Sequence, residues 1–135
     1  MRLTAKSLAE YKKNWEEETA REEIFSERSR QKALKTAEIC KDILVKKFSV
    51  TKVVLFGSVL ERGSFQIDSD IDIAVEGLAR DAYFTALARI MMKSQFDVDL
   101  KPIEDVSNLL RERISRGKVL YEKKQDTKSN LRNQG

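Results

Sequence analysis

The hydrophobic positions along the chain fall into stretches that alternate between helical and strand-like spacing. Between residues 29 and 48 the apolar side chains recur every three or four positions, which predicts an amphipathic helix that covers a sheet. A second helical pattern covers residues 80–93, and a short one follows Ser107, a residue type that often caps helix N-termini. Apolar or alternating runs predict strands at residues 50–56, 71–75, 96–100 and 119–121. This order of elements predicts a single α/β domain.

The helical spacing also predicts which side chains point inward. Cys40 lies on the apolar stripe of the helix at 29–48, so we expect a small core residue rather than a reactive thiol. Gly117 follows the last short helix, at the C′ position where glycine is favoured. For the two shorter helices the predicted inward residues are Tyr83, Phe84, Leu87, Ile90 and Met91 in the first, and Leu109, Leu110 and Ile114 in the second.

Residues 1–28 are polar with a thin apolar stripe. Ser7 and Glu10 have the spacing of a capping box, and Leu8, Tyr11 and Trp15 then share one helical face. This predicts an extra N-terminal helix that packs loosely on the domain. The alternative is a helix anchored by Trp15 that binds either a partner protein or a second copy of the chain in a homo-oligomer. Residues 123–135 have little apolar content and are expected to form a disordered tail.

The candidate chemistry lies at the end of one predicted strand and the beginning of the next. Asp70 and Asp72 are two residues apart on a predicted strand, so both carboxylates share a face. Two like charges held this close are costly without a cation, and hard oxygen ligands suit Mg²⁺. Gly57 and Ser58 form a turn after the preceding strand, where backbone N–H groups and a hydroxyl can approach phosphates. The combination indicates chemistry on a nucleoside triphosphate.

The order Gly57-Ser58, a spacer, then Ser69-Asp70-Ile71-Asp72 resembles the signature of the polymerase-beta-like nucleotidyltransferase superfamily. It is most similar to the minimal nucleotidyltransferases, which often form the antitoxin half of pairs whose toxin is a HEPN-type ribonuclease. The resemblance covers residues 33–122, with a spacer about one residue longer than in small members. It implies a nucleotidyltransferase fold, in which a small mixed sheet of about four strands is flanked by helices. The implied domain division is a helical extension at 1–28, the nucleotidyltransferase domain at 29–122, and the tail at 123–135.

The resemblance also implies a cofactor and roles for individual residues. Family members carry a third carboxylate on the strand after the second helix, commonly just before a leucine. Asp99 precedes Leu100 and is the better match, with Asp97 as the alternative. Asp70, Asp72 and Asp99 are then the catalytic residues and the ligands of a two-ion Mg²⁺ site, and Gly57 and Ser58 bind the phosphates of ATP. Arg62 in the spacer meets a triphosphate or a partner, or is simply solvated.

Composition excludes several other classes of protein. The chain has 135 residues, no histidine and one cysteine, so imidazole-based catalysis, an intrachain disulfide and a cysteine-rich zinc site are excluded. No apolar run approaches the ~20 residues that span a membrane, and no signal-peptide core is present, so we expect a cytoplasmic protein without membrane contact. The formal net charge is +4, and the basic residues are interleaved with acidic ones without stacking aromatics, which argues against a nucleic-acid-binding module.

The acceptor of the transferred nucleotide is the least constrained part of the hypothesis. Little chain remains outside the core to bind a small acceptor, so the resemblance favours an antitoxin that transfers AMP to a tyrosine of its HEPN toxin. Two alternatives remain open at this stage. One is a binding antitoxin that masks the toxin without chemistry, and the other is a small-molecule nucleotidyltransferase of the aminoglycoside-modifying type.

Overall fold

The computed structural model describes residues 4–66 and 68–124 and confirms the predicted α/β architecture. Each predicted strand is present, although the first and third begin two residues later than expected. Short 3₁₀ turns lie at Ser58–Leu60, Arg80–Ala82 and Ile103–Asp105. The helices are α1 (Ala5–Phe48), α2 (Tyr83–Lys93) and α3 (Asn108–Ser115), and the strands are β1 (Lys52–Phe56), β2 (Ile71–Glu76), β3 (Val98–Pro102) and β4 (Lys118–Glu122).

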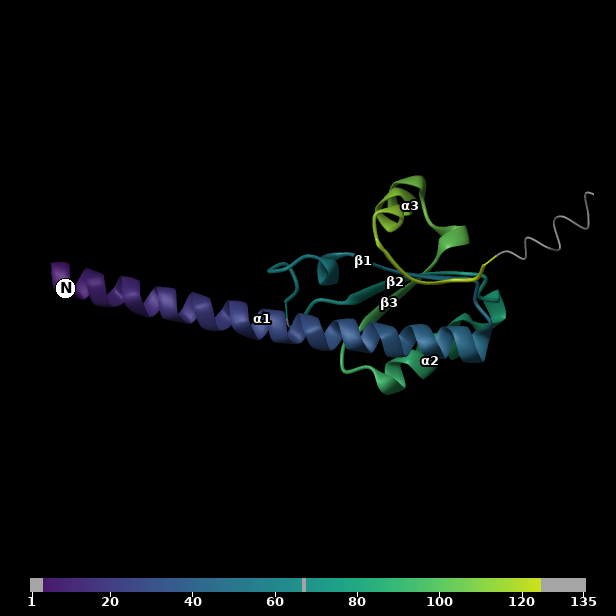
Figure 1. Ribbon diagram of the computed structural model, residues 1–135, viewed down its shortest axis with the longest axis horizontal. Helices are drawn as coiled ribbons and strands as arrows, with labels where there is room; N and C mark the ends of the chain where they lie inside the picture. Colours follow the sequence, from purple (N-terminus) through teal and green to yellow (C-terminus); the bar gives the residue numbers. More distant parts are fainter. Residues whose placement is uncertain (1–3, 67, 125–135) are drawn as a thin grey trace, which may run out of the picture.

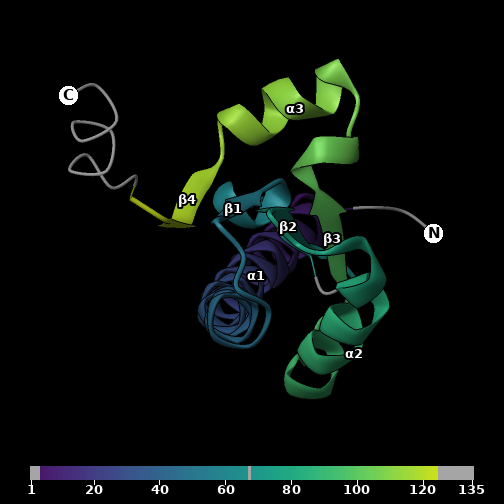
Figure 2. The same ribbon diagram turned by 90° about the vertical axis from the view of Figure 1, so that its right-hand side faces the viewer.

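The four strands form one mixed sheet in the order β3-β2-β1-β4. β1 pairs antiparallel with both β2 and β4, whereas β2 and β3 are parallel and are joined by the crossover through α2. Figures 1 and 2 show α1 and α2 side by side on one face of the sheet and α3 on the other. The main core lies between the sheet and the first two helices, and a smaller cluster lies under α3.

Helix α1 is one continuous helix of 44 residues rather than two helices. Its N-cap is Thr4, whose hydroxyl accepts the backbone N–H of Ser7 at 3.1 Å, so the prediction of Ser7 as the cap was wrong. The C-terminal half buries the predicted stripe, and burial raises the pKa of the Cys40 thiol to about 11, as expected for a core residue. The helix runs without a break through the predicted boundary at residue 28. Most of the tail predicted at 123–135 lies outside the described residues.

The shorter helices depart from the prediction at three positions. Phe84 is 79% exposed, Met91 is also exposed, and Leu109 is 74% exposed, so placing these three in the core was wrong. The reason is that each helix buries a narrow stripe. In α2 it is centred on Ala86 and Ile90, and in α3 on Ile114. The predicted cap is confirmed, because the Ser107 hydroxyl accepts the N–H of Leu110 at 3.2 Å.

Gly117 follows the C-cap of α3 as predicted, but not because it adopts a left-handed conformation. A Cβ atom at this position would lie 2.6 Å from the Leu55 carbonyl oxygen and 2.8 Å from Val54 Cγ1. The glycine therefore allows the start of β4 to approach β1 closely. None of the helices in residues 4–66 and 68–124 combines the length and apolarity needed to cross a membrane.

Candidate active site

Strand β2 separates its apolar and acidic side chains onto opposite faces. Ile71 and Ile73 are fully buried against the α1–α2 side, while Asp72 lies half-buried on the other face. Asp70 immediately precedes the strand and is exposed. This alternation follows from the two-residue period of a strand, and it places both aspartates at the beginning of β2, as the sequence predicted.

The neighbouring strand brings a third carboxylate to Asp72. In the parallel β2–β3 ladder Asp72 is the direct partner of Asp99. Asp97 lies just before β3, with an exposed side chain, and its backbone carbonyl accepts the N–H of Ile71 at 2.9 Å. The register therefore places Asp99 beside Asp72. Asp97 lies two residues earlier, just before β3 begins.

Gly57 meets the same carboxylate from the other neighbouring strand. Phe56, the last residue of β1, pairs with Asp72, and Gly57 follows with a φ of +84°. A Cβ atom at Gly57 would lie 2.1 Å from Asp72 Oδ2, so no other residue fits without moving that carboxylate. Ser58 then begins a short 3₁₀ turn and is half-buried. The predicted glycine–serine turn thus lies at the same edge of the sheet as the aspartates.

The crowding of negative charge affects Asp72 most. Burial, followed by the charges of Asp99 and Asp70, raises the pKa of Asp72 from 3.8 to about 6. Arg113 of α3 and Lys101 of β3 act in the opposite direction. A cation at this position would relieve the repulsion between the carboxylates.

The donor set fits a divalent cation, with one rearrangement. Within the residues described, no three acidic, cysteine or histidine side chains are already gathered closely enough to hold a metal ion. Asp99 is instead engaged by Lys101, whose Nζ lies 3.4 Å from Asp99 Oδ1. Carboxylate oxygens are the ligands that Mg²⁺ prefers. Asp70, Asp72 and Asp99 are the residues that would hold such an ion, which would compete with Lys101 for Asp99.

Sequence reasoning missed the two cations near Asp72. Lys101 could have been found, because it lies two residues after Asp99 and therefore on the same face of β3. Arg113 carries no such signal, since only the packing of α3 over the sheet brings it toward Asp72. Both side chains are suited to anionic ligands as well as to the carboxylates.

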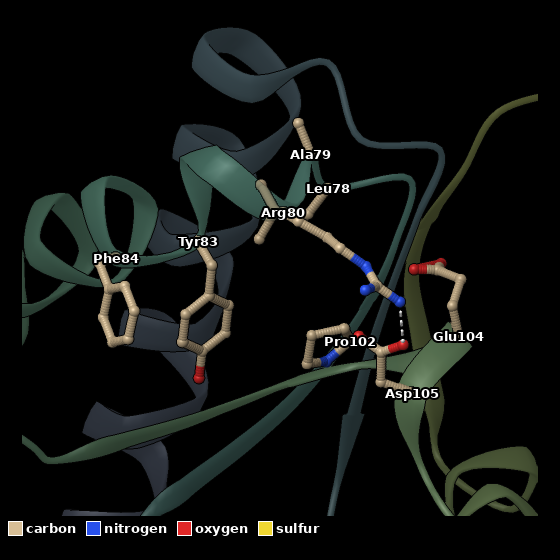
Figure 3. Close-up of a pocket in the computed structure, with 8 residues that line it drawn as sticks. All are labelled: Leu78, Ala79, Arg80, Tyr83, Phe84, Pro102, Glu104 and Asp105. Atoms are coloured by element: carbon tan, nitrogen blue, oxygen red, sulfur yellow. Dashed lines mark hydrogen bonds and ion pairs between the residues drawn. The ribbon is translucent and has the colours of Figure 1, made fainter.

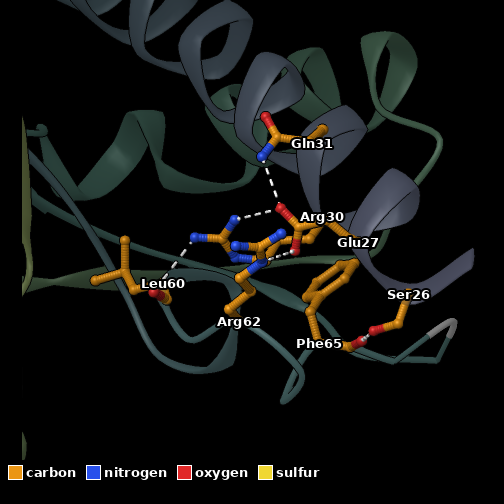
Figure 4. Close-up of polar contacts among 7 residues, drawn as sticks. All are labelled: Ser26, Glu27, Arg30, Gln31, Leu60, Arg62 and Phe65. Carbon is orange, nitrogen blue, oxygen red and sulfur yellow. Dashed lines mark hydrogen bonds and ion pairs between the residues drawn. The ribbon is translucent and has the colours of Figure 1, made fainter. Parts of the chain in front are cut away.

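The loop that carries Ser58 is fastened to the middle of α1 (Figure 4). The Ser26 hydroxyl donates to the carbonyl of Phe65, and the Arg30 guanidinium donates to the carbonyl of Leu60 at 3.5 Å. Phe65 itself is fully buried and packs edge-to-face on the ring of Phe96. These contacts fix the loop between β1 and β2 to residues 26–30 of α1. The sequence had predicted a boundary within this range, between the N-terminal extension and the domain.

Glu27 joins two arginines at this junction. Its carboxylate lies 3.1 Å from Arg30 and 3.7 Å from Arg62, and it accepts a hydrogen bond from Gln31 at 2.9 Å. The Gln31 hydrogen bond first, then the charges of Arg30 and Arg62, hold the pKa of Glu27 below its usual value. Arg62 is 82% exposed, so its guanidinium is held only from one side.

A separate pocket of about 550 Å³ lies at the other end of β2 (Figure 3). Its lining residues follow the C-terminal ends of β2 and β3, whereas the aspartates lie at the beginnings of these strands. An ion pair between Arg80 and Asp105 at 3.1 Å spans it. Because the pocket is far along the sheet from Asp72, it is not the site of the predicted chemistry.

Gly57, Asp70, Asp72 and Asp99 form an acidic edge, where β1 ends and β2 and β3 begin. Residues 38–126 match the family described as polymerase beta, nucleotidyltransferase. This range is more than half of the chain, and the chain therefore belongs to that family. The match begins within α1, after the residues that fasten the loop, and ends just beyond β4.

Among solved structures, the chain is similar to members of toxin–antitoxin pairs. One is a toxin–antitoxin structure with AMP-PNP, at 27% identity and a TM-score of 0.54, covering 72% of this chain and 86% of that one. Another is a variant of the MntA–HpeT toxin–antitoxin, at 27% identity and a TM-score of 0.50, covering 69% and 75%. A second MntA–HpeT variant, at 24% identity and a TM-score of 0.54, supports the fold. No curated protein sequence matches the chain significantly.

Proposed function

We propose that this chain is an ATP- and Mg²⁺-dependent adenylyltransferase that modifies a protein. In this proposal it is the antitoxin of a HEPN/MNT pair, and it transfers AMP to a tyrosine of the HEPN ribonuclease toxin. The family membership supports the reaction class. The similarity to a toxin–antitoxin chain crystallised with AMP-PNP supports the nucleotide and the kind of partner.

The observation that carries the proposal is the position of Asp72. It lies between Asp99 on β3 and Gly57 after β1. The carboxylates therefore meet, at one edge of the sheet, a glycine turn whose backbone other groups can approach closely. Nucleotidyl transfer needs mainly position and charge, because the phosphoryl centre itself requires little covalent help. An edge that gathers metal ligands beside a phosphate-binding turn supplies both, and it does so without a histidine.

In the proposed reaction the tyrosine oxygen forms a bond to the α-phosphorus of ATP. The bond from that phosphorus to the α–β bridging oxygen breaks, and pyrophosphate leaves. Asp70 and Asp72 would hold the metal ions, and Asp99 would complete the ligand set and accept the proton of the tyrosine hydroxyl. Gly57 and Ser58 would hold the β- and γ-phosphates. Bound Mg²⁺ would supply positive charge to the phosphate oxygens and lower the pKa of the attacking hydroxyl.

A macromolecular acceptor fits the amount of chain available. Outside α1, the elements of the described residues are the four strands of the sheet, two short helices and three 3₁₀ turns, which leaves little chain to enclose a small acceptor. The pocket of about 550 Å³ lies at the opposite end of the strands. A protein acceptor brings its own surface and needs only an open edge on which to dock.

The test is to incubate the protein with ATP, Mg²⁺ and the HEPN-type protein encoded beside it, and to measure the intact mass of that protein. We expect the mass of AMP to be added by the wild type and by Asp97→Asn, and not by Asp70→Asn. If Asp70→Asn neutralises the toxin as well as the wild type and no mass changes, the antitoxin acts by binding alone. If the wild type modifies an aminoglycoside but not the toxin, the antitoxin assignment is wrong.

A further inference from the structure

Residues 5–25 of α1 form an arm that extends beyond the rest of the domain (Figure 1). The hydrogen bonds and the ion pair that tie α1 to the loop after β1 are made by Ser26, Glu27 and Arg30. At 1.5 Å per residue, the 21 residues before Ser26 extend about 30 Å past this loop. The arm therefore begins at the end of the sheet where Gly57, Asp70 and Asp72 lie.

The arm carries an apolar stripe with no partner in the described chain. Leu8, Tyr11 and Trp15 share one face of the helix, and all three are exposed, Trp15 to 61%. Three large apolar side chains on one exposed helical face are typical of an interface, and tryptophan and tyrosine are the residues that most often carry binding energy.

The direction of this stripe follows from the helical repeat. Leu8 and Ser26 are 18 residues apart, and so are Trp15 and Ala33, a separation of about five helical turns. Ser26 donates to the loop after β1, and Ala33 is fully buried against the sheet. The stripe consequently lies on the domain-facing side of α1 and looks into the space in front of the acidic edge.

A groove connects the stripe to the loop. A hollow of about 630 Å³ lies where the arm meets the loop, lined by Thr19, Glu22, Phe25 and Ser26 from α1 and by Gly63 and Gln66 from the loop. Thr19 and Glu22 continue the face of Trp15, because they follow it at four and seven positions. The hollow therefore begins about one helical turn after Trp15 and ends at the loop that follows Ser58.

The charge of the arm limits what can occupy this surface. Residues 16–23 contain five glutamates and one arginine. Glu18 and Glu22 lie beside Trp15 on the stripe side, where Lys12 is the nearest cation in the helical repeat. Two copies of the arm packed in parallel would place these glutamates against each other, which disfavours that arrangement. A protein with a basic surface, such as an enzyme that binds RNA phosphates, is complementary.

We propose that the arm stripe (Leu8, Tyr11 and Trp15) and the groove beside it are the docking surface for the acceptor protein. The acceptor contributes an apolar cleft bordered by lysine and arginine. Docking there holds the acceptor in front of the acidic edge, so that a hydroxyl of its surface reaches the α-phosphate. This inference rests on the proposed function for the identity of the acceptor, and it concerns residues that precede the family match at 38–126.

The test compares the double variant Tyr11→Ala/Trp15→Ala with Phe84→Ala, which removes an equally exposed aromatic ring from α2. Calorimetry with the HEPN-type protein encoded beside this chain should show binding at least about tenfold weaker for the double variant. Binding by Phe84→Ala should equal that of the wild type. In AMP transfer the double variant should raise the KM for the HEPN protein and leave kcat and ATP binding unchanged.

Charge reversal gives a second readout on the folded protein. Glu18→Lys/Glu22→Lys should weaken docking relative to the wild type, and the difference should be largest at low ionic strength. At high ionic strength, salt screens the attraction in the wild type as well. Wild-type affinity in the double alanine variant would overturn the docking surface. So would a wild-type dimer, seen by light scattering, that Trp15→Ala dissociates. If the arm variants weaken binding while no AMP is transferred by the wild type, the docking surface stands and the proposed reaction fails.

Discussion

The raised pKa and the close packing of the Asp72 carboxylate follow from the positions of three neighbouring residues. Asp99 is placed by strand register, Asp70 by the two-residue period of β2, and Gly57 by the end of β1. The half-buried carboxylate meets two like charges, and its pKa rises to about 6. Such a cluster is unfavourable for folding and useful for a cation, which is a common property of functional sites.

Asp72→Asn should stabilise the metal-free protein at neutral pH. A carboxyl whose folded pKa is raised from 3.8 to about 6 costs nothing below its unfolded pKa. The cost grows as the pH rises between the two values and is complete above the folded one. The shift corresponds to roughly 2 kcal/mol after allowance for partial exposure. Urea unfolding in EDTA should show a higher free energy of unfolding for the variant than for the wild type at pH 7.5, and little difference at pH 3.5. Equal stability at pH 7.5 would contradict the unfavourable crowding of negative charge at Asp72.

Asp99→Asn and Asp97→Asn should differ sharply in activity. Asp99 is the direct ladder partner of Asp72, and Asp97 is exposed before the strand begins. We expect AMP transfer to fall about 100-fold or more for Asp99→Asn and to remain measurable for Asp97→Asn. Steady-state rates with ATP and the HEPN-type protein decide between them. The reverse order would mean that the third carboxylate was assigned to the wrong residue.

At the scale of secondary structure, the sequence predicted what depends on local periodicity. Alternation predicted a common face for Asp70 and Asp72 and another for Asp97 and Asp99, whereas only the family resemblance grouped Asp99 with the first pair. The stripe of α1 predicted its buried residues. The continuity of α1 was missed because the apolar stripe weakens across the acidic residues 16–23, although no proline or glycine interrupts residues 5–48. Phe84 and Leu109 were misplaced because tertiary packing selects a narrower stripe than hydrophobicity indicates.

The loop between β1 and β2 should depend on Glu27. Glu27→Gln keeps the size of the side chain and removes the charge that pairs with Arg30 and Arg62. Because the lowered pKa shows that the ionised form stabilises the folded state, the wild type should lose this contribution as the pH falls below the usual glutamate range. Backbone amides of residues 61–66 should then exchange with deuterium faster in the variant at neutral pH.

The matched control for this change is Glu38→Gln. Glu38 pairs with Lys41 at 3.2 Å and lies about three turns further along α1, beside Lys118 and Leu120 of β4 rather than beside the loop. Its removal should leave exchange in residues 61–66 unchanged. Equal exchange rates in the wild type and Glu27→Gln would show that the Ser26 and Arg30 contacts hold the loop without the ion pairs.

For the whole molecule, the arrangement of the sheet determines where chemistry can occur. The antiparallel β1–β2 pair and the parallel β2–β3 pair bring the end of β1 and the beginnings of β2 and β3 to one edge. Helices cover both faces of the sheet, and the arm of α1 extends past this edge. The separation of the edge from the pocket at the opposite end explains why an open acceptor surface, rather than an enclosed cavity, is expected.

The most direct measurement is calorimetry of ATP with the wild-type protein, with and without Mg²⁺. We expect binding that requires Mg²⁺, disappears in EDTA, and is lost or strongly weakened in Asp70→Asn and Asp72→Asn although both variants remain folded. No ATP binding by folded wild-type protein in Mg²⁺ would contradict the account, and so would binding of equal strength in EDTA.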